Sequence, residues 1–256
     1  SKQKKSNYYL LRCQFLRGDQ KLFHRTLDKL IQKNEVHPIL GSLCDRALHR
    51  FGTTTRNPFC ENPIKNFEKI NLNKQYNFKK QVIEPVSRIL NGHRLSFKKQ
   101  RLLKSGRQTG GNLFLEYRKN LDGIIDIINE EVERYRRDPR RSDQGFIINW
   151  PQKFRLLGWL IEIENNGQLG PHIHEEGWVS GCIYINVPPK DTLQSANLVI
   201  SVDTDEYNVN GYNNSKKVID VATGDLCLFP SSLLHYTVPF CSSEKRVVLG
   251  FDVVPN

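Results

Sequence analysis

Apolar residues recur at helical spacing in several stretches of the first 145 residues. From Tyr8 to Asn34 most of them fall on one face, at intervals of three to four residues, which predicts an amphipathic helix. Gly18 and Asp19 are expected to break this helix in two. A further helix is predicted from Pro38 and should end at Gly52, a residue suited to a helix C-terminus.

Two more helices are predicted in the same half of the chain. Phe78–Leu90 is amphipathic, although Pro85 should kink or divide it. Leu121–Arg137 has the clearest apolar stripe, and its basic last turn suits the helix dipole. The Asn-, Pro- and Thr-rich residues 53–78 are expected to form a long connection. The glycine-rich Gly106–Phe114 lacks the Gly-Lys-Ser/Thr ending of a phosphate-binding loop and is expected to be an ordinary loop.

The pattern changes at Phe146 to short β-branched and aromatic runs separated by turn signals, which predict strands. The expected strands are Phe154–Glu164, Val179–Val187, Leu198–Val202, Val218–Val221, Asp225–Phe229, Leu234–Val238 and Arg246–Val254. Strands at this spacing without intervening helices favour an antiparallel sandwich or barrel. The sequence therefore predicts an α+β protein, with a mainly helical region at residues 1–145 and an all-β domain at residues 146–256.

The first helices resemble tetratricopeptide-type helix pairs. The chain holds no second full copy of such a pair, so a repeat array could be present only as a remnant.

The formal net charge of +11 is unevenly distributed. Residues 146–256 hold 7 Lys and Arg against 12 Asp and Glu, whereas residues 1–145 hold 31 against 15. A basic half is compatible with binding to an acidic partner such as nucleic acid, or with solvated helix faces. Acidic and apolar residues interleave with the basic ones in Lys65–Lys80 and Arg134–Arg141, which favours solvated faces and gives no support to nucleic acid as a partner.

No apolar run approaches the roughly 18 residues of a membrane-spanning helix, and Ser1–Asn7 leads into no signal-type hydrophobic stretch. The six cysteines show neither a C-x-x-C pair nor the spacing of a disulfide framework. We therefore expect a cytoplasmic protein with reduced thiols, no zinc site and no membrane association. The sequence does not indicate an oligomeric state.

Three of the seven histidines lie in the β half, at positions 172, 174 and 235. On an extended strand, residues two apart face the same side, so His172 and His174 could share one metal ion. His235 follows a later apolar run and could supply a third ligand from across a barrel. Two ligands close in sequence and one far along the chain match the facial arrangement of non-haem Fe(II) sites. A His-x-His pair alone is equally compatible with a surface feature or a hydrogen-bonded core pair.

Ordered blocks add to this pattern: Gln168–His174, Gly177–Asn186, Gly224–Ser231, His235 and Arg246. Over residues 146–256 they resemble, in unbroken order, the blocks of a 2-oxoglutarate-Fe(II) oxygenase family whose prolyl-hydroxylase-like members use a double-stranded β-helix of the jelly-roll or cupin type. Gly106–Phe114 is similar to a segment of members with tetratricopeptide regions.

The resemblance implies roles for single residues. His172, His174 and His235 take the metal-ligand positions. Arg246 takes the position of the arginine that holds the distal carboxylate of 2-oxoglutarate, and a guanidinium suits a carboxylate because it pairs bidentately and keeps its charge. Tyr184 matches a tyrosine that hydrogen-bonds the same carboxylate, although it could equally be an ordinary packed aromatic residue.

The sequence departs from the usual pattern at one position. Most such oxygenases have an acidic residue two positions after the first histidine, where this chain has His174. Either the site uses three histidines, or His174 pairs with Glu176 to restore two histidines and one carboxylate.

The implied enzyme is an Fe(II)- and 2-oxoglutarate-dependent dioxygenase, a hydroxylase that consumes O2 and releases succinate and CO2. Its substrate is expected to be a peptide or protein side chain or a small metabolite. The alternative is a non-catalytic, cupin-like binding module with a helical interaction region, which would not need the three histidines and Arg246 together.

Overall fold

The computed structural model describes residues 2–53, 56–92, 95–204 and 215–256. The helices are α1 (Lys2–Arg17), α2 (Gln20–Gln32), α3 (Pro38–Phe51), α4 (Glu84–Leu90), α5 (Leu113–Glu116), α6 (Arg118–Arg137) and α7 (Gly145–Ile148). The strands are β1 (Glu68–Asn71), β2 (Phe97–Lys98), β3 (Leu103–Thr109), β4 (Phe154–Leu169), β5 (Val179–Asn186), β6 (Leu198–Ser201), β7 (Lys216–Ile219), β8 (Asp225–Pro230), β9 (Leu234–Thr237) and β10 (Arg246–Pro255). None of these helices combines the length and apolar character needed to cross a bilayer.

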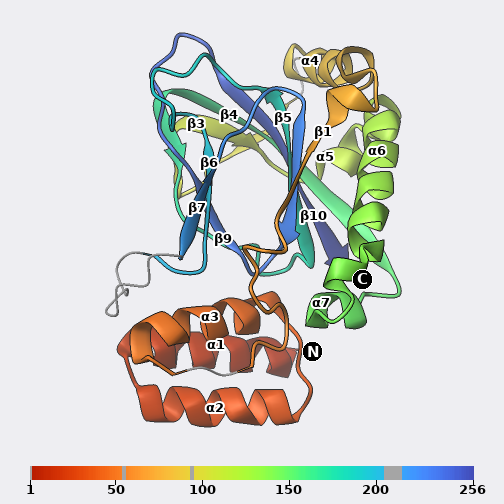
Figure 1. Ribbon diagram of the computed structural model, residues 1–256. Helices are drawn as coiled ribbons and strands as arrows, with labels where there is room; N and C mark the ends of the chain where they lie inside the picture. Colours follow the sequence, from red (N-terminus) through yellow and green to blue (C-terminus); the bar gives the residue numbers. More distant parts are fainter. Residues whose placement is uncertain (1, 54–55, 93–94, 205–214) are drawn as a thin grey trace.

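Two antiparallel sheets face each other as a double-stranded β-helix (Figure 1). The larger has the order β1-β8-β5-β10-β4-β3-β2, and the smaller has the order β7-β6-β9. Helix α6 covers the outer face of the larger sheet, where its apolar stripe packs on alternate residues of β10 such as Leu249 and Phe251. The intervening residues of β10 face the smaller sheet. Because both faces are covered, β10 reads as a nearly continuous apolar run.

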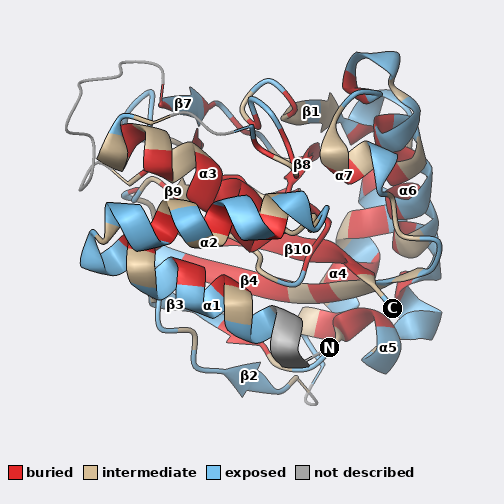
Figure 2. Cartoon of the chain, turned by 90° about the horizontal axis from the view of Figure 1, so that it is seen from below, coloured by how far each residue is buried: buried red, intermediate tan, exposed pale blue. Residues whose placement is uncertain are grey.

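Helices α1, α2 and α3 form a layer at one end of this sandwich (Figure 1). Their shared core is built from residues at helical spacing, among them Leu11, Phe15, Phe23 and Leu27. Figure 2 shows α3 mostly buried between its neighbours, while α2 keeps an exposed polar face.

Most of the predicted elements are confirmed. The first helix breaks at Gly18, and α3 ends at Gly52, whose φ of 68° is the left-handed conformation expected of a helix C-cap. Pro85 divides its helix as expected: the preceding turn, Lys79–Ile83, is π-helical, and the Glu84 N–H donates to the carbonyl of Lys79.

Other predictions need correction. The segment predicted as the loop Gly106–Phe114 contains the end of β3, and the predicted connection 53–78, of which residues 54–55 lie outside the described part, contains β1. The register of β3 against β4 shifts between Lys104 and Gly106, and a Cβ at Gly106 would lie 2.5 Å from the Glu162 carbonyl oxygen. The glycine thus permits a bulged strand to approach its neighbour, which a loop-like composition conceals.

Strand bounds shift at two places. The strand predicted over Phe154–Glu164 continues to Leu169, and the strand predicted over Val218–Val221 lies two residues earlier. Strands β1, β2 and β3 come from the first part of the chain and join the larger sheet. The division of the chain between residues 145 and 146 stays a prediction.

Candidate functional site

The three histidines of the β half come together at the end of the sandwich that faces the helical layer. His235 belongs to β9, whereas His172 and His174 lie in the segment of residues 170–178 between β4 and β5. An isolated antiparallel bridge joins His172 to His235: the backbone N–H of each donates to the carbonyl of the other, at 3.1 and 3.0 Å. The N–H of His174 donates to the carbonyl of Ser231 at 3.1 Å. Backbone pairing thus holds the segment in an extended form without making it a regular strand.

The imidazole rings face one another. One nitrogen from each of His172, His174 and His235 can be chosen so that all three lie within 4.8 Å of one another. The Nε2 atoms of His172 and His174 are 3.3 Å apart. Two imidazoles bound at adjacent positions of one ion have nitrogens about 3 Å apart, given metal–nitrogen bonds of roughly 2.1 Å. The spacing therefore fits a shared metal ion.

Hydrogen bonds orient each ring. His172 Nδ1 donates to the Gly170 carbonyl at 2.8 Å, and His235 Nδ1 donates to the Leu233 carbonyl at 3.1 Å. A carbonyl oxygen can only accept, so these Nδ1 atoms carry the protons and leave the Nε2 lone pairs for a ligand. Metal-binding histidines in proteins are commonly oriented in this way.

Burial favours the uncharged rings. It lowers the pKa of His172 to about 4, with a smaller contribution from the neighbouring His174. For His235, burial and the two other histidines hold the pKa well below its ordinary value. Neutral imidazole is the form that binds a metal, so His172 and His235 are ready for one at neutral pH.

Asp252 completes the surroundings of His174. Its Oδ1 accepts from His174 Nδ1 at 2.5 Å and from the Ser180 hydroxyl at 2.7 Å. Ser180 also lies 2.7 Å from the hydroxyl oxygen of Ser231. A carboxylate behind a ligand histidine fixes its tautomer and makes the other nitrogen a stronger donor to a metal.

Glu176 lies outside this cluster. Its carboxylate pairs with Lys5 of α1 at 2.6 Å, and its side chain is 64% exposed. The structure thus brings His172, His174 and His235 together and directs Glu176 toward the helical layer.

A cavity of about 310 Å³ extends from the histidines into the sandwich. Alternate residues of two central strands line it: Leu157, Trp159, Ile161 and Ile163 of β4, and Arg246, Val248, Gly250 and Asp252 of β10. These residues share one face because side chains alternate along a strand. The cavity therefore joins the histidine end, near Asp252, to the polar end, near Arg246.

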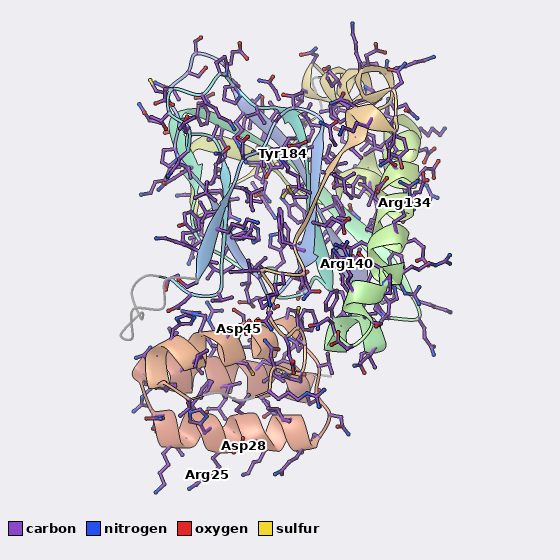
Figure 3. All side chains as sticks on the ribbon, in the orientation of Figure 1. Arg25, Asp28, Asp45, Arg134, Arg140 and Tyr184 are labelled. Carbon is purple, nitrogen blue, oxygen red and sulfur yellow. The ribbon has the colours of Figure 1, made fainter. Side chains whose placement is uncertain are left out.

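Arg246 and Tyr184 both line this cavity. Arg246 is 3% exposed, and its guanidinium carbon lies 5.0 Å from the centre of the Tyr184 ring. Its Nε donates to the Ala196 carbonyl at 3.1 Å, and within the described residues the guanidinium has no carboxylate partner. The Tyr184 side chain lies inside the sandwich (Figure 3), where its hydroxyl meets no hydrogen-bond partner of normal geometry among the described residues.

A buried cation and an orphaned hydroxyl in one cavity fit an anionic ligand. Burying a charge without a partner is costly, and a carboxylate would satisfy both groups. The histidines and this pair therefore fit, at opposite ends of one cavity, a metal ion and a small carboxylic acid.

Sequence reasoning did not identify Asp252, Ser180 or Trp159 as part of the site. Asp252 could have been found, because it lies six residues after Arg246 and so shares its face of the strand. Trp159, whose ring centre is 5.4 Å from that of His174, carried no signal beyond that of an ordinary strand aromatic.

Comparisons with known proteins agree with this geometry. Residues 158–252 match a family described as "Putative 2OG-Fe(II) oxygenase". Among solved structures, a prolyl hydroxylase from Trichoplax adhaerens, in complex with a hypoxia inducible factor oxygen degradation domain peptide fragment, is similar with a TM-score of 0.51 and 13% identity, covering 88% of this chain and 91% of that one. A comparison with curated proteins finds no match.

Two further structures are similar at lower scores. A prolyl-4-hydroxylase from Pseudomonas putida has a TM-score of 0.49 and 11% identity, covering 75% of this chain and 93% of that one. HygX from Streptomyces hygroscopicus, with nickel and 2-oxoglutarate bound, has a TM-score of 0.47 and 13% identity, covering 75% and 83%. The family match spans the segment from β4 to β10 that carries the histidines, Tyr184 and Arg246.

Proposed function

We propose that the chain is a dioxygenase that uses Fe(II), 2-oxoglutarate and O2 to hydroxylate a C–H bond, releasing succinate and CO2. One observation carries this proposal: a single cavity holds three converging imidazoles at one end and a buried guanidinium without a carboxylate partner, among the described residues, at the other.

In this proposal His172, His174 and His235 would hold the metal ion. Bound Fe(II), together with 2-oxoglutarate, supplies the oxidising chemistry. The contribution of the protein is to aim the three Nε2 atoms at one point and to keep those of His172 and His235 unprotonated. Their Nδ1 hydrogen bonds and their burial do this.

Arg246 and Tyr184 bind the distal carboxylate of 2-oxoglutarate. The guanidinium supplies charge and paired donors, and the hydroxyl supplies a further donor. Ile161, Ile163 and Val248 form apolar walls around the intervening space and exclude water from it.

The absence of a carboxylate ligand agrees with the charges of the bound groups. An Fe(II) ion, doubly charged 2-oxoglutarate, the Arg246 guanidinium and the Asp252 carboxylate would sum to zero, so three neutral imidazole ligands would leave the filled site uncharged. Asp252, acting through His174, adds a partial negative charge without occupying a metal position. Glu176 is not needed as a ligand and stays with Lys5.

The substrate is proposed to be a peptide or protein side chain, or a small metabolite. Polar residues border the cavity opening, among them Lys98, Gln100 and Glu175. The similar Trichoplax adhaerens enzyme was solved with a peptide fragment, which supports a peptide for this chain. Cytoplasmic localisation also remains part of the proposal, and all six cysteines are free, as a reducing compartment requires.

The decisive experiment measures cosubstrate binding and turnover in the purified chain. We expect 2-oxoglutarate to bind by calorimetry in the presence of Mn(II), and succinate to form when Fe(II), O2 and ascorbate are supplied. His235→Ala and Arg246→Ala should each abolish succinate formation, whereas Lys245→Ala, which removes an outward-facing neighbour of Arg246, should not. A metal-loaded wild-type chain that binds no 2-oxoglutarate would instead identify a cupin-like binding module.

A further inference from the structure

The segment that carries His172 and His174 lies between the sandwich and helix α1. On the sandwich side, its backbone pairs with Ser231 and His235. On the other side, three of its side chains contact the helical layer. These contacts lie outside the metal cluster itself.

Ile173 lies between the two histidines in sequence and, although it also lines the cavity, packs against the helical layer. In an extended segment, alternate residues face opposite sides. His172 and His174 therefore turn toward His235, while Ile173 packs against the apolar core of α1, α2 and α3. The helical layer thus holds the residue that links two members of the cluster.

Glu175 and Glu176, which follow His174 directly, pair with one face of α1. Arg12 Nη1 lies 2.5 Å from Glu175 Oε1, and the Tyr9 hydroxyl donates to Glu175 Oε2 at 3.1 Å. Lys5 Nζ lies 2.6 Å from Glu176 Oε1. Positions 5, 9 and 12 follow the i, i+4, i+7 spacing of one helix face, so α1 presents three donors in a row to these two acids.

We propose that α1 is a positioning element of the metal centre: through Ile173 and the Arg12–Glu175 pair, it fixes the segment that aims His172 and His174. This inference rests on the proposed function. A ligand pair tolerates little displacement, because the geometry around the ion depends on where both rings are held.

The two kinds of contact should contribute differently. Arg12 and Glu175 are partly exposed, with side-chain exposures of 46% and 30%, so their pair is weak and is screened by salt. Ile173 acts through apolar packing, which salt does not screen. Metal affinity should therefore depend strongly on Ile173 at all salt concentrations, and weakly on Arg12 and Glu175 at low salt only.

The test titrates the full chain with Co(II) and follows the visible absorption of the bound ion. Hydrogen exchange of residues 170–178 is measured alongside. Ile173→Ala should weaken Co(II) binding roughly tenfold and speed exchange in the segment. Arg12→Ala and Glu175→Ala should each weaken it roughly two- to fivefold at low salt, and the double variant should be no worse than either single variant. These differences should vanish at about 1 M salt, where the Debye length is about 3 Å.

Matched controls test whether the effect depends on where the substituted residue lies, and not only on which type of residue is removed. Arg17→Ala removes another exposed arginine of α1, and Ile148→Ala removes an isoleucine that is 66% exposed. Both should bind Co(II) as the wild type does. If Ile173→Ala fails to fold, the two single variants and the double variant of Arg12 and Glu175 still test whether α1 positions the metal centre. Unchanged Co(II) affinity and exchange in both sets of variants would overturn this inference alone, whereas a wild type that binds no Co(II) would overturn the proposed function as well.

Discussion

Arg246 is a buried cation whose position suits a ligand better than it suits the stability of the fold. Without a carboxylate partner among the described residues, its guanidinium is held by one backbone carbonyl and the face of Tyr184. Buried charges that lack a partner destabilise a protein, and an apolar residue of similar length is often better tolerated. A residue kept at such a cost is expected to serve binding.

Arg246→Met should therefore stabilise the ligand-free protein while abolishing 2-oxoglutarate binding. We expect a gain of about 1 kcal/mol in the free energy of unfolding, which is a rise of roughly 2–4 °C in Tm for a chain of this size. Thermal unfolding and calorimetry measure the two effects. Lys245→Met serves as control, because Lys245 pairs with Glu164 at the surface. A strong loss of stability in Arg246→Met would indicate a structural role for the guanidinium.

Asp252 is expected to control metal affinity through His174. Asp252→Asn keeps the shape of the side chain but removes its charge, so His174 becomes a weaker donor to the ion. Co(II) affinity should fall roughly 10- to 100-fold, as for other residues behind a ligand histidine. Asp220→Asn changes an acid that is 81% exposed and should have no effect. Equal affinity in Asp252→Asn and the wild type would show that the carboxylate does not act on the metal.

The candidate site could be predicted from the sequence only in part. His172, His174, His235, Tyr184 and Arg246 were predicted as site residues, and the structure places them around one cavity. The two alternatives for Glu176 could not be separated, because the direction of a side chain in an irregular segment depends on what packs against it. Here Glu176 pairs with Lys5, which is far away in the sequence.

At the scale of elements, apolar periodicity was sufficient to predict a helix or strand wherever one face of that element is buried continuously. Helix α6 and strand β10 are of this kind, and both were predicted. Strands β1 and β3 were missed because they are short or polar and are held mainly by backbone pairing with β8 and β4. Such strands leave little periodic signal in their own sequence.

Helix α3 is expected to introduce a pH dependence of stability at the junction of the helical layer and the sandwich. Figure 3 shows Asp45 at this junction, where Asn57 Nδ2 donates to its carboxylate at 3.0 Å. Burial raises the pKa of Asp45 to about 7, although the Asn57 amide opposes this. A raised pKa in the folded state means that the contribution of Asp45 is fully present below about pH 4 and is lost as the pH rises through about 7.

Asp45→Asn should remove this dependence. Relative to wild type, the variant should be about equally stable at pH 4 and about 4 kcal/mol more stable at pH 8. Urea unfolding at several pH values measures the difference. Asp28→Asn provides the control, since Asp28 lies on the exposed face of α2 (Figure 3). A stability difference that is constant between pH 4 and pH 8 would contradict the expectation.

At the scale of the whole molecule, the contrast between a basic first part and an acidic second part does not correspond to two separate bodies. The larger sheet takes strands from both parts. Part of the basic charge is paired locally: on α6, Arg134 pairs with Glu130 and Arg137 pairs with Glu133. This agrees with solvated helix faces, and the absence of a nucleic-acid partner stays a prediction.

The helical layer and the sandwich should unfold together, and ligands should stabilise both. Ile173 packs into the core of the layer, and Arg46 of α3 pairs with Asp203 of the sandwich at 3.6 Å. A ligand that binds only the folded state at 100 times its Kd adds about 2.7 kcal/mol. Saturating Mn(II) and 2-oxoglutarate should therefore raise a single Tm by roughly 5–10 °C. Hydrogen exchange should slow in α1 and α3 as well as in β9 and β10. Two separate transitions, with only the later one moving on ligand addition, would show instead that the layer folds as an independent domain and does not position the metal centre.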